Sequence, residues 1–295
     1  MAISMQKLVF DSCQILIKGK YLRSIVIALI MTAVIYAVLI EPYKIEVHHV
    51  WIRDAYLGKV LENKIIIQLS DLHIKNIGKR EQKVLNIIDK LNPDIIFLTG
   101  DYVKFKGNYA PALKFLSRLK AKIGIWAVMG DYDYSRSRSS CLFCHEKGRW
   151  KPVGNGPVRF LKDALDTVQF PAGSVLLGGV DGLDVDGKSP FLSGSDYLSV
   201  KNSAPMIILS HSPLFFDMID DSQDVLVLAG DTHGGQIPLP SWLLKVMGYK
   251  KNALYSQGLF EKGQKKMFVT RGIGTSHFPI RLFRRPEVVV LHFKP

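Results

Sequence analysis

Cysteine is scarce in this sequence, and acidic residues are outnumbered by basic ones. With only three cysteines in 295 residues, a disulfide framework is excluded, and the low count is typical of a reducing compartment. Internal repeats and low-complexity segments are also absent, which excludes solenoid, propeller and collagen-like classes. A chain of this length can bury the core of one large domain or two small ones.

Two of the cysteines form the pattern Cys141-Leu-Phe-Cys144-His145, which matches the attachment motif of c-type haem. A basic loop rich in serine and arginine surrounds it, and no axial ligand suggests itself. A surface loop that carries two thiols is therefore the favoured interpretation.

The formal net charge is +13, from 39 basic and 26 acidic residues. Such a balance suits nucleic acid, an anionic membrane surface or a phosphorylated substrate, and it also suits a merely solvated basic face. The amino terminus favours the membrane, so we expect an anionic membrane surface as a partner and no nucleic acid.

Long hydrophobic runs are absent except near the amino terminus, where Ile25–Ile40 holds sixteen residues without a charge. As a helix this run would be ~24 Å long, somewhat less than the ~30 Å hydrocarbon core of a bilayer. Glu41 and Pro42 end it, and residues 5–18 before it are amphipathic at helical spacing. We predict a membrane anchor over residues 1–44. A signal peptide is the alternative, but no small-x-small cleavage site precedes the Glu-Pro boundary.

The orientation of this anchor stays open. The positive-inside rule places Lys18, Lys20 and Arg23 in the cytoplasm, so a spanning helix would carry the rest of the chain across the membrane. A helix lying in one leaflet would leave everything on the cytoplasmic side.

Short aliphatic runs alternate with helical patterns after residue 45. The alternation predicts an α/β fold over residues 45–295, with a candidate insertion near 135–156. The runs are Ile65–Leu69, Ile95–Leu98, Ile123–Met129, Met206–Leu209, Val225–Leu228, Met267–Thr270 and Val288–Phe293, and helical patterns lie near residues 84–91 and 113–119.

Aspartate or histidine follows each of the first five runs. Ligands of an open α/β sheet bind at the carboxyl ends of its strands, so these loops can converge. Any one of them is a common turn, but five in order are hard to ascribe to turn chemistry. The residues concerned are Asp71, His73, Asp101, Asp131, His211, Asp231 and His233.

The order Asp-x-His, Gly-Asp, Gly-Asp, His, Gly-Asp-x-His resembles calcineurin-like metallophosphoesterases. The stretches "SDLH", "LTGD", "THGGQ" and "TRGIGTSHFPIR" resemble the membrane-associated YkuE/YaeI branch, which includes UDP-2,3-diacylglucosamine pyrophosphatases. The similarity covers about residues 60–293 and implies a sandwich of two mixed sheets flanked by helices, here preceded by a membrane helix. It also implies two divalent metal ions.

By this resemblance, one ion would take Asp71, His73 and His233, with Asp101 bridging to the other. The second ion would add the side chains at 131, 211 and 231. The family has Asn, His and His at positions 131, 132 and 231, where this chain has Asp131, Tyr132 and Asp231.

Both metal-site replacements are genuine ligands, and both fall on the same ion, which favours adjustment of the site rather than its loss. Four carboxylates formally cancel the charge of two divalent ions, which should weaken their Lewis acidity. Oxygen ligands in place of imidazole should shift preference from zinc towards Mn²⁺, with Mg²⁺ also suitable.

Tyr132 stands where the family histidine assists the leaving group. Tyrosine, with a pKa near ~10, is a poor proton donor at neutral pH. A phosphate leaving group, whose second pKa is ~6, needs little protonation, so cleavage of a pyrophosphate bond best tolerates this residue. Arg271 and Arg281 are candidate phosphate contacts, with structural salt bridges as the alternative.

The favoured function is a membrane-associated, two-metal phosphohydrolase of a lipid-linked nucleotide diphosphate. The resemblance implies UDP-2,3-diacylglucosamine, cleaved to UMP and the lipid 1-phosphate in lipid A biosynthesis, by an inner-membrane protein, single-pass or monotopic, with its main domain on the cytoplasmic side. A general phosphodiesterase or phosphatase is the second interpretation. A metal-depleted relative that binds phosphorylated ligands without turnover is the third.

Overall fold

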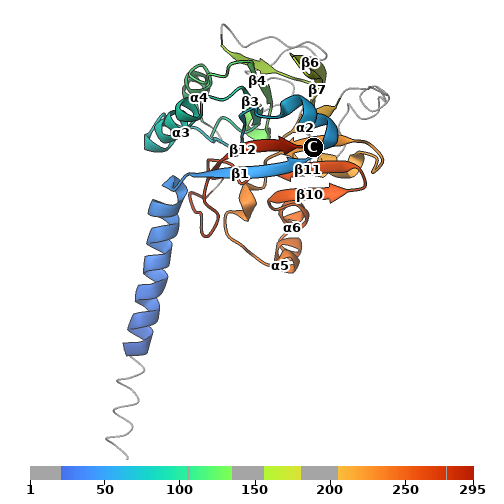
Figure 1. Ribbon diagram of the computed structural model, residues 1–295. Coiled ribbons are helices and arrows are strands. Elements are labelled where there is room, and N and C mark those ends of the chain that lie inside the picture. The colour runs from blue at the N-terminus through green and yellow to red at the C-terminus, as the bar shows by residue number, and fades with distance from the viewer. Residues whose placement is uncertain (1–20, 105–106, 135–155, 181–204, 277) are drawn as a thin grey trace, which may run out of the picture.

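Two six-stranded sheets face each other in the computed structural model, which describes residues 21–104, 107–134, 156–180, 205–276 and 278–295 (Figure 1). Helices flank the sandwich, and an apolar helix precedes it, so the predicted fold class is confirmed. The predicted insertion lies outside the described residues except for its last position, as do Cys141, Cys144 and the amphipathic segment 5–18.

The first sheet is built mainly from parallel strands. Only the β12–β2 pair is antiparallel. In spatial order the sheet contains β1 (Glu46–Arg53), β12 (Glu287–Lys294), β2 (Ile66–Leu69), β3 (Ile95–Thr99), β4 (Gly124–Val128) and β5 (Val158–Phe160).

The second sheet has antiparallel strands at both edges and parallel strands between them. In spatial order it contains β10 (Gly258–Lys262), β11 (Lys265–Val269), β9 (Val225–Ala229), β8 (Met206–Ser210), β7 (Gly173–Val180) and β6 (Ala164–Phe170).

Both faces of the central strands are buried, which explains their continuous apolar runs. Between the sheets, Trp126 and Val128 pack with Leu177, Leu209 and other aliphatic side chains. On the outer face of the first sheet lie α3 (Lys79–Leu91) and α4 (Tyr109–Leu116), with α2 (Ala55–Leu61) beside β12 and β7. On the outer face of the second sheet, Phe215 and Phe216 of a 3₁₀ segment cover the strands.

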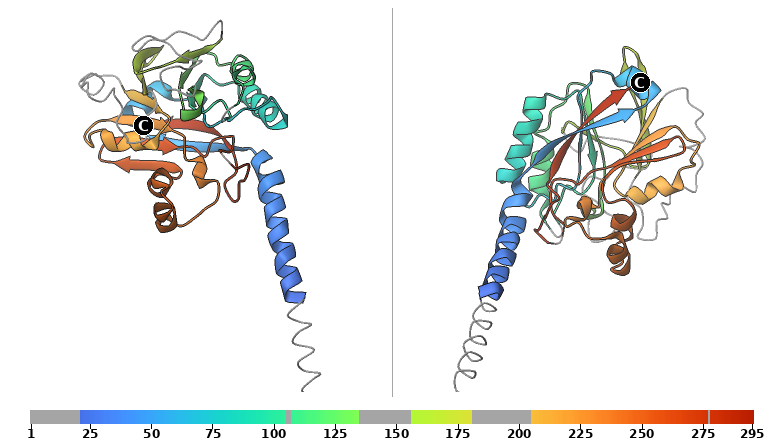
Figure 2. Two further views of the ribbon diagram at one scale, coloured as in Figure 1. Left: turned by 180° about the vertical axis from the view of Figure 1, so that it is seen from behind. Right: turned by 60° about the horizontal axis from the view of Figure 1, so that its bottom comes forward.

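The N-terminal helix runs from Tyr21 to Tyr43 and projects away from the domain (Figures 1 and 2). Its mean hydropathy is 2.4 over the most apolar window, of which 11% is buried, so its side chains face outward almost throughout. The last turns pack on the domain: the Arg281 N–H donates to the Ala37 carbonyl at 3.0 Å, and the Arg284 N–H to Glu41 Oε1 at 2.7 Å. By length and composition this is one helix that could cross a membrane.

Two short helices, α5 (Ser241–Val246) and α6 (Lys250–Leu254), follow the loop after β9. They pack on each other and lie on the side of the domain from which the N-terminal helix departs (Figures 1 and 2). Neither helix was predicted from the sequence.

Candidate metal centre

The loops that follow β2, β3, β4, β8 and β9 bring all seven predicted metal ligands to one end of the sandwich. Each ligand-bearing strand is parallel to its neighbour within its sheet, so the carboxyl ends emerge together. The side chains form three overlapping groups whose ligand atoms lie within 4.8 Å of one another: Asp71, His73 and His233; Asp71, Asp101 and His211; Asp131, His211 and Asp231.

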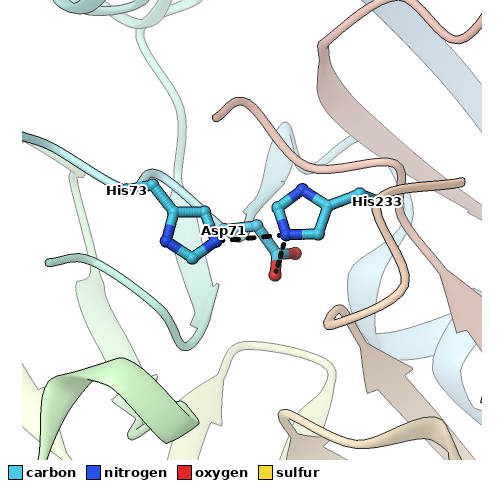
Figure 3. A group of neighbouring side chains, drawn as sticks. All are labelled: Asp71, His73 and His233. Carbon is cyan, nitrogen blue, oxygen red and sulfur yellow. Dashed lines mark hydrogen bonds and ion pairs between the residues drawn. The ribbon is translucent and has the colours of Figure 1, made fainter. Parts of the chain in front are cut away.

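The first group, drawn in Figure 3, is almost completely buried. His73 Nε2 and His233 Nε2 face each other at 3.1 Å, and His233 Nε2 lies 3.5 Å from Asp71 Oδ1. Burial lowers the pKa of His73 to about 4 and that of His233 well below its usual value. Both imidazoles are therefore neutral at pH 7, the form in which histidine binds a metal ion.

Asp101 presents one oxygen to each side of the centre. Its Oδ2 lies 3.5 Å from His73 Nε2, and its Oδ1 lies 3.5 Å from His211 Nε2. A carboxylate placed in this way can bridge two ions, as the predicted arrangement requires.

His211 is oriented by its other ring nitrogen. Nδ1 lies 2.8 Å from the Thr99 carbonyl, to which it donates, while the buried Nε2 has no hydrogen-bond partner among the described residues. A carbonyl that fixes the tautomer in this way is the usual support for a metal-binding histidine.

The donor set fits divalent ions. Ligand atoms around a tetrahedral ion with bonds of ~2.1 Å are ~3.4 Å apart, and the separations of 3.1 and 3.5 Å found here agree with that spacing. Neutral imidazoles and carboxylates in this combination suit zinc, manganese or iron.

Residues 65–233 match the family described as calcineurin-like phosphoesterase. The chain belongs to this family. It is 33% identical over 231 residues to the uncharacterized metallophosphoesterase YkoQ of Bacillus subtilis, covering 76% of this chain and 81% of that protein.

Two further relatives have more specific names. One is the UDP-2,3-diacylglucosamine pyrophosphatase LpxG of Chlamydia muridarum, 26% identical over 277 residues, with 77% of this chain and 82% of that protein covered. The other is the phosphodiesterase YaeI of Escherichia coli, 28% identical over 207 residues, with 68% and 70% covered. As a calcineurin-like phosphoesterase, the chain is a hydrolase of phosphoester or phosphoric anhydride bonds.

Five of the seven predicted metal ligands have a strained backbone. Asp71, His73, Asp101, Asp231 and His233 all have φ between 43° and 72°, the left-handed region that non-glycine residues seldom adopt. Gly130 permits a close approach of the β4 loop to Asp101, because a Cβ there would lie 2.2 Å from Asp101 Oδ1. Such positions persist only where the surrounding structure holds them.

Asp133 supplies part of that support. The carboxylate is fully buried and accepts four backbone hydrogen bonds. The donors are the N–H groups of Gly130 and Asp101, each at 2.8 Å from Oδ2, and of Tyr102 and Val103, at 2.8 and 3.2 Å from Oδ1. One side chain thus ties the β3 loop to the β4 loop.

Lys251 on α6 is a site residue that the sequence analysis missed. Its ammonium group forms an ion pair with Asp231 Oδ2, leaving Asp231 Oδ1 as the oxygen without this partner. The pKa of Lys251 is raised: burial alone would lower it, but Asp231 more than offsets this. In the sequence, Lys250 and Lys251 are typical of an ordinary exposed pair of lysines. Only the tertiary structure brings Lys251 to the metal centre.

Tyr132 lies beside the first metal group, with its ring centroid 5.0 Å from that of His73. Burial and the neighbouring carboxylates raise the pKa of its phenol to about 12. The side chain is therefore a neutral and very weak acid at pH 7, and its place beside the leaving group stays a prediction.

The guanidinium of Arg271 forms structural salt bridges, which were the alternative to phosphate binding. Its Nε donates to Glu287 Oε2 at 2.7 Å, and its Nη2 lies 3.1 Å from Glu46 Oε2.

Arg281 is fully buried. It donates to the carbonyls of Gly274, Arg284 and Arg271 and lies 3.5 Å from His233 Nδ1. Both arginines thus hold the loops around the centre, and their binding of phosphate remains a prediction.

Proposed function

We propose that the protein is a membrane-associated phosphohydrolase with two divalent ions that cleaves the diphosphate bond of UDP-2,3-diacylglucosamine. The products are UMP and 2,3-diacylglucosamine 1-phosphate. The observation that carries this choice is Tyr132, whose pKa of about 12 makes it a weak proton donor at the leaving-group position. A phosphate leaving group departs without being protonated, whereas an alkoxide leaving group needs a proton.

The residues of the metal centre have different roles in this proposal. Two divalent ions, when bound, would activate water and draw charge from the phosphoryl oxygens. Asp101 fixes the spacing of the two sites, since its two oxygens face different histidines. Thr99 holds the His211 ring, and Asp133 holds the backbone of the β3 and β4 loops. The burial of Asp71 and His73 keeps bulk water from that side of the centre.

Mn²⁺ is the ion we propose, with Mg²⁺ as a second possibility. Asp131 and Asp231 give the second site two carboxylates and one imidazole, and hard divalent cations prefer oxygen ligands. Lys251 offsets part of the added negative charge, which keeps the centre attractive for a phosphate group.

A general phosphodiesterase is the second candidate. The similarity to YaeI supports it to the same degree as the similarity to LpxG supports the first candidate. The apolar helix Tyr21–Tyr43 favours the lipid substrate, because a water-soluble diester requires no attachment to a membrane.

The test is an assay of the full-length protein in mixed micelles, with Mn²⁺ and UDP-2,3-diacylglucosamine, in which both products are identified by mass spectrometry. The blank is Asp101→Ala, and the matched control is Asp89→Ala on the exposed surface of α3. We expect UMP formation in wild type and D89A but not in D101A. Hydrolysis of bis-p-nitrophenyl phosphate without any UMP would favour the phosphodiesterase, and ligand binding without turnover would favour a binding protein.

The membrane orientation gives an independent test. UDP-2,3-diacylglucosamine requires a domain on the cytoplasmic side, so accessibility of the domain to protease in intact spheroplasts would rule out this substrate.

A further inference from the structure

Large apolar side chains are exposed on α5 and on the loop before β12, and hydrogen bonds with Gln236 hold that loop beside the segment that leads into α5. Trp242, Val246, Phe278 and Phe283 are 67%, 79%, 70% and 71% exposed, and Met247 is 51% exposed. We call these five residues the docking face. In α5 only Leu244 is buried, so the helix presents most of its apolar surface outward. Single exposed apolar residues are ordinary, but a group of this size indicates a binding surface.

The chain segments that carry the docking face are basic. No aspartate or glutamate occurs in residues 232–260 or 278–286, whereas Lys245, Lys250 and Arg285 are exposed there. Aromatic and aliphatic side chains flanked by lysine and arginine are the composition that binds the interface of an anionic bilayer.

The docking face is continuous with the N-terminal helix. The loop that carries Phe278 and Phe283 bonds to the end of that helix through the N–H groups of Arg281 and Arg284. Figures 1 and 2 show α5 on the same side of the domain as the departing helix, in every view. A bilayer entered by the helix therefore lies on the side that the docking face presents.

The same elements hold the metal loop after β9. Asn252 of α6 donates to the Thr232 carbonyl at 2.6 Å, and the Gln236 carbonyl accepts from the Leu282 N–H at 2.8 Å. The loop with Asp231 and His233 thus lies between α6 and the 278–283 loop. A surface bound by the docking face would lie next to the metal centre.

We infer that the docking face binds the surface of an anionic bilayer, so that the domain is held at two places and its metal centre adjoins the lipid. This inference rests on the proposed membrane association of the N-terminal helix, but not on the identity of the substrate. A second copy of the chain is the other possible occupant, and it would be detected as an outcome below.

The experiment uses full-length protein reconstituted into vesicles that contain phosphatidylglycerol and a lipid brominated in its acyl chains, which quenches tryptophan on contact. The helix anchors every variant, so attachment itself is not the readout. Trp242→Phe is compared with Trp51→Phe, because Trp51 is similarly exposed, at 55%, but lies on β1 and stacks on His292. We expect W242F to remove about half or more of the quenchable fluorescence and W51F to leave it unchanged, since aromatic rings settle at the bilayer interface.

Equal quenching in W242F and wild type would overturn the inference. A dimer that forms with increasing protein concentration and in which Trp242 is shielded from brominated lipid would also overturn the inference. That result would assign the docking face to a second copy of the chain. A second variant, Val246→Asp, should lower turnover of vesicle-borne lipid substrate while turnover of bis-p-nitrophenyl phosphate stays unchanged. Quenching at Trp242 without any lipid turnover would retain the docking face and reject the proposed substrate.

Discussion

Lys251 forms an ion pair with Asp231, one of the two carboxylates that distinguish this centre from the family pattern. Two divalent ions and four carboxylates formally cancel, and Lys251 adds one positive charge at the second site. The family histidine at 231 is therefore replaced by a pair of opposite charges rather than by a bare carboxylate. This pairing restores part of the positive potential that a phosphoesterase needs for its anionic substrate.

Replacing Lys251 with methionine should strengthen metal binding and weaken catalysis. Without the ammonium group, both oxygens of Asp231 are available to the ion, and we expect the weaker of the two Mn²⁺ sites to tighten by about twofold to fivefold, the range of a partly exposed ion pair. The KM for a phosphate substrate should rise in the same variant. Isothermal titration of the metal-free protein with Mn²⁺ measures the first effect.

The control is Lys250→Met, which removes the same charge from the neighbouring exposed position and should change neither quantity. Asp231→His should broaden zinc tolerance fully only when combined with K251M, because the lysine would otherwise face an imidazole. Additive effects of the two substitutions would contradict the coupling.

Tyr132→His should raise turnover selectively. A general acid contributes on the order of 10²-fold or more where the leaving group needs a proton. We therefore expect a large gain for an alkyl phosphodiester and a small one for the lipid diphosphate, measured as kcat on both substrates. An equal gain on both would show that Tyr132 is not matched to a phosphate leaving group.

Asp133→Asn should destabilise the protein even without metal. The amide nitrogen would face N–H groups that now donate to a carboxylate oxygen, and a buried donor left unpaired costs about 1–3 kcal/mol. We expect a loss of about 3 kcal/mol in urea unfolding of the metal-free protein. Asp131→Ala, two positions away and exposed, removes a predicted ligand, and it should cost much less stability in the metal-free protein while it weakens metal binding. If both variants unfold at the same urea concentration, Asp133 does not organise the loops.

Glu287 should make stability depend on acid pH. Burial alone would raise its pKa, but the hydrogen bond with His48 and the charge of Arg271 lower it to about 2 from an ordinary 4.5. A depressed carboxyl pKa gives stability that is complete above 4.5 and is lost as the pH falls towards 2. The loss is on the order of 3 kcal/mol.

The pH dependence due to His48 has the opposite sign, since Glu287 raises the pKa of His48. The stability that His48 contributes is complete below the usual histidine pKa and is lost as the pH rises above it. Thermal unfolding between pH 7 and 2.5 should show the acid loss in wild type and a smaller loss in Glu287→Gln. Glu46→Gln, whose carboxylate also contacts Arg271 but is 43% exposed, serves as the control. Parallel curves for all three proteins would refute the assignment.

The sequence by itself determined the central strands and the loops that bear the ligands. Its seven predicted strands agree with β2, β3, β4, β8, β9, β11 and β12 to within one or two residues at each end. Its two helical patterns overlap α3 and α4, which begin four or five residues earlier. Strands buried on both faces consist of consecutive apolar residues, so the local sequence identifies them. Edge strands such as β1 and β10, with mixed polar and apolar residues, carry no such signal.

Only the tertiary structure decided the strand order and the partners of the site residues. β12 inserts between β1 and β2, although more than 200 residues separate it from both. That insertion brings Glu287 to Arg271 and the loop before it to the end of the N-terminal helix. Lys251 reaches Asp231 in the same way, across 20 residues of chain. Local sequence encodes the period of an element and the chemistry of its loop, whereas a contact between distant residues exists only once the sheets have packed.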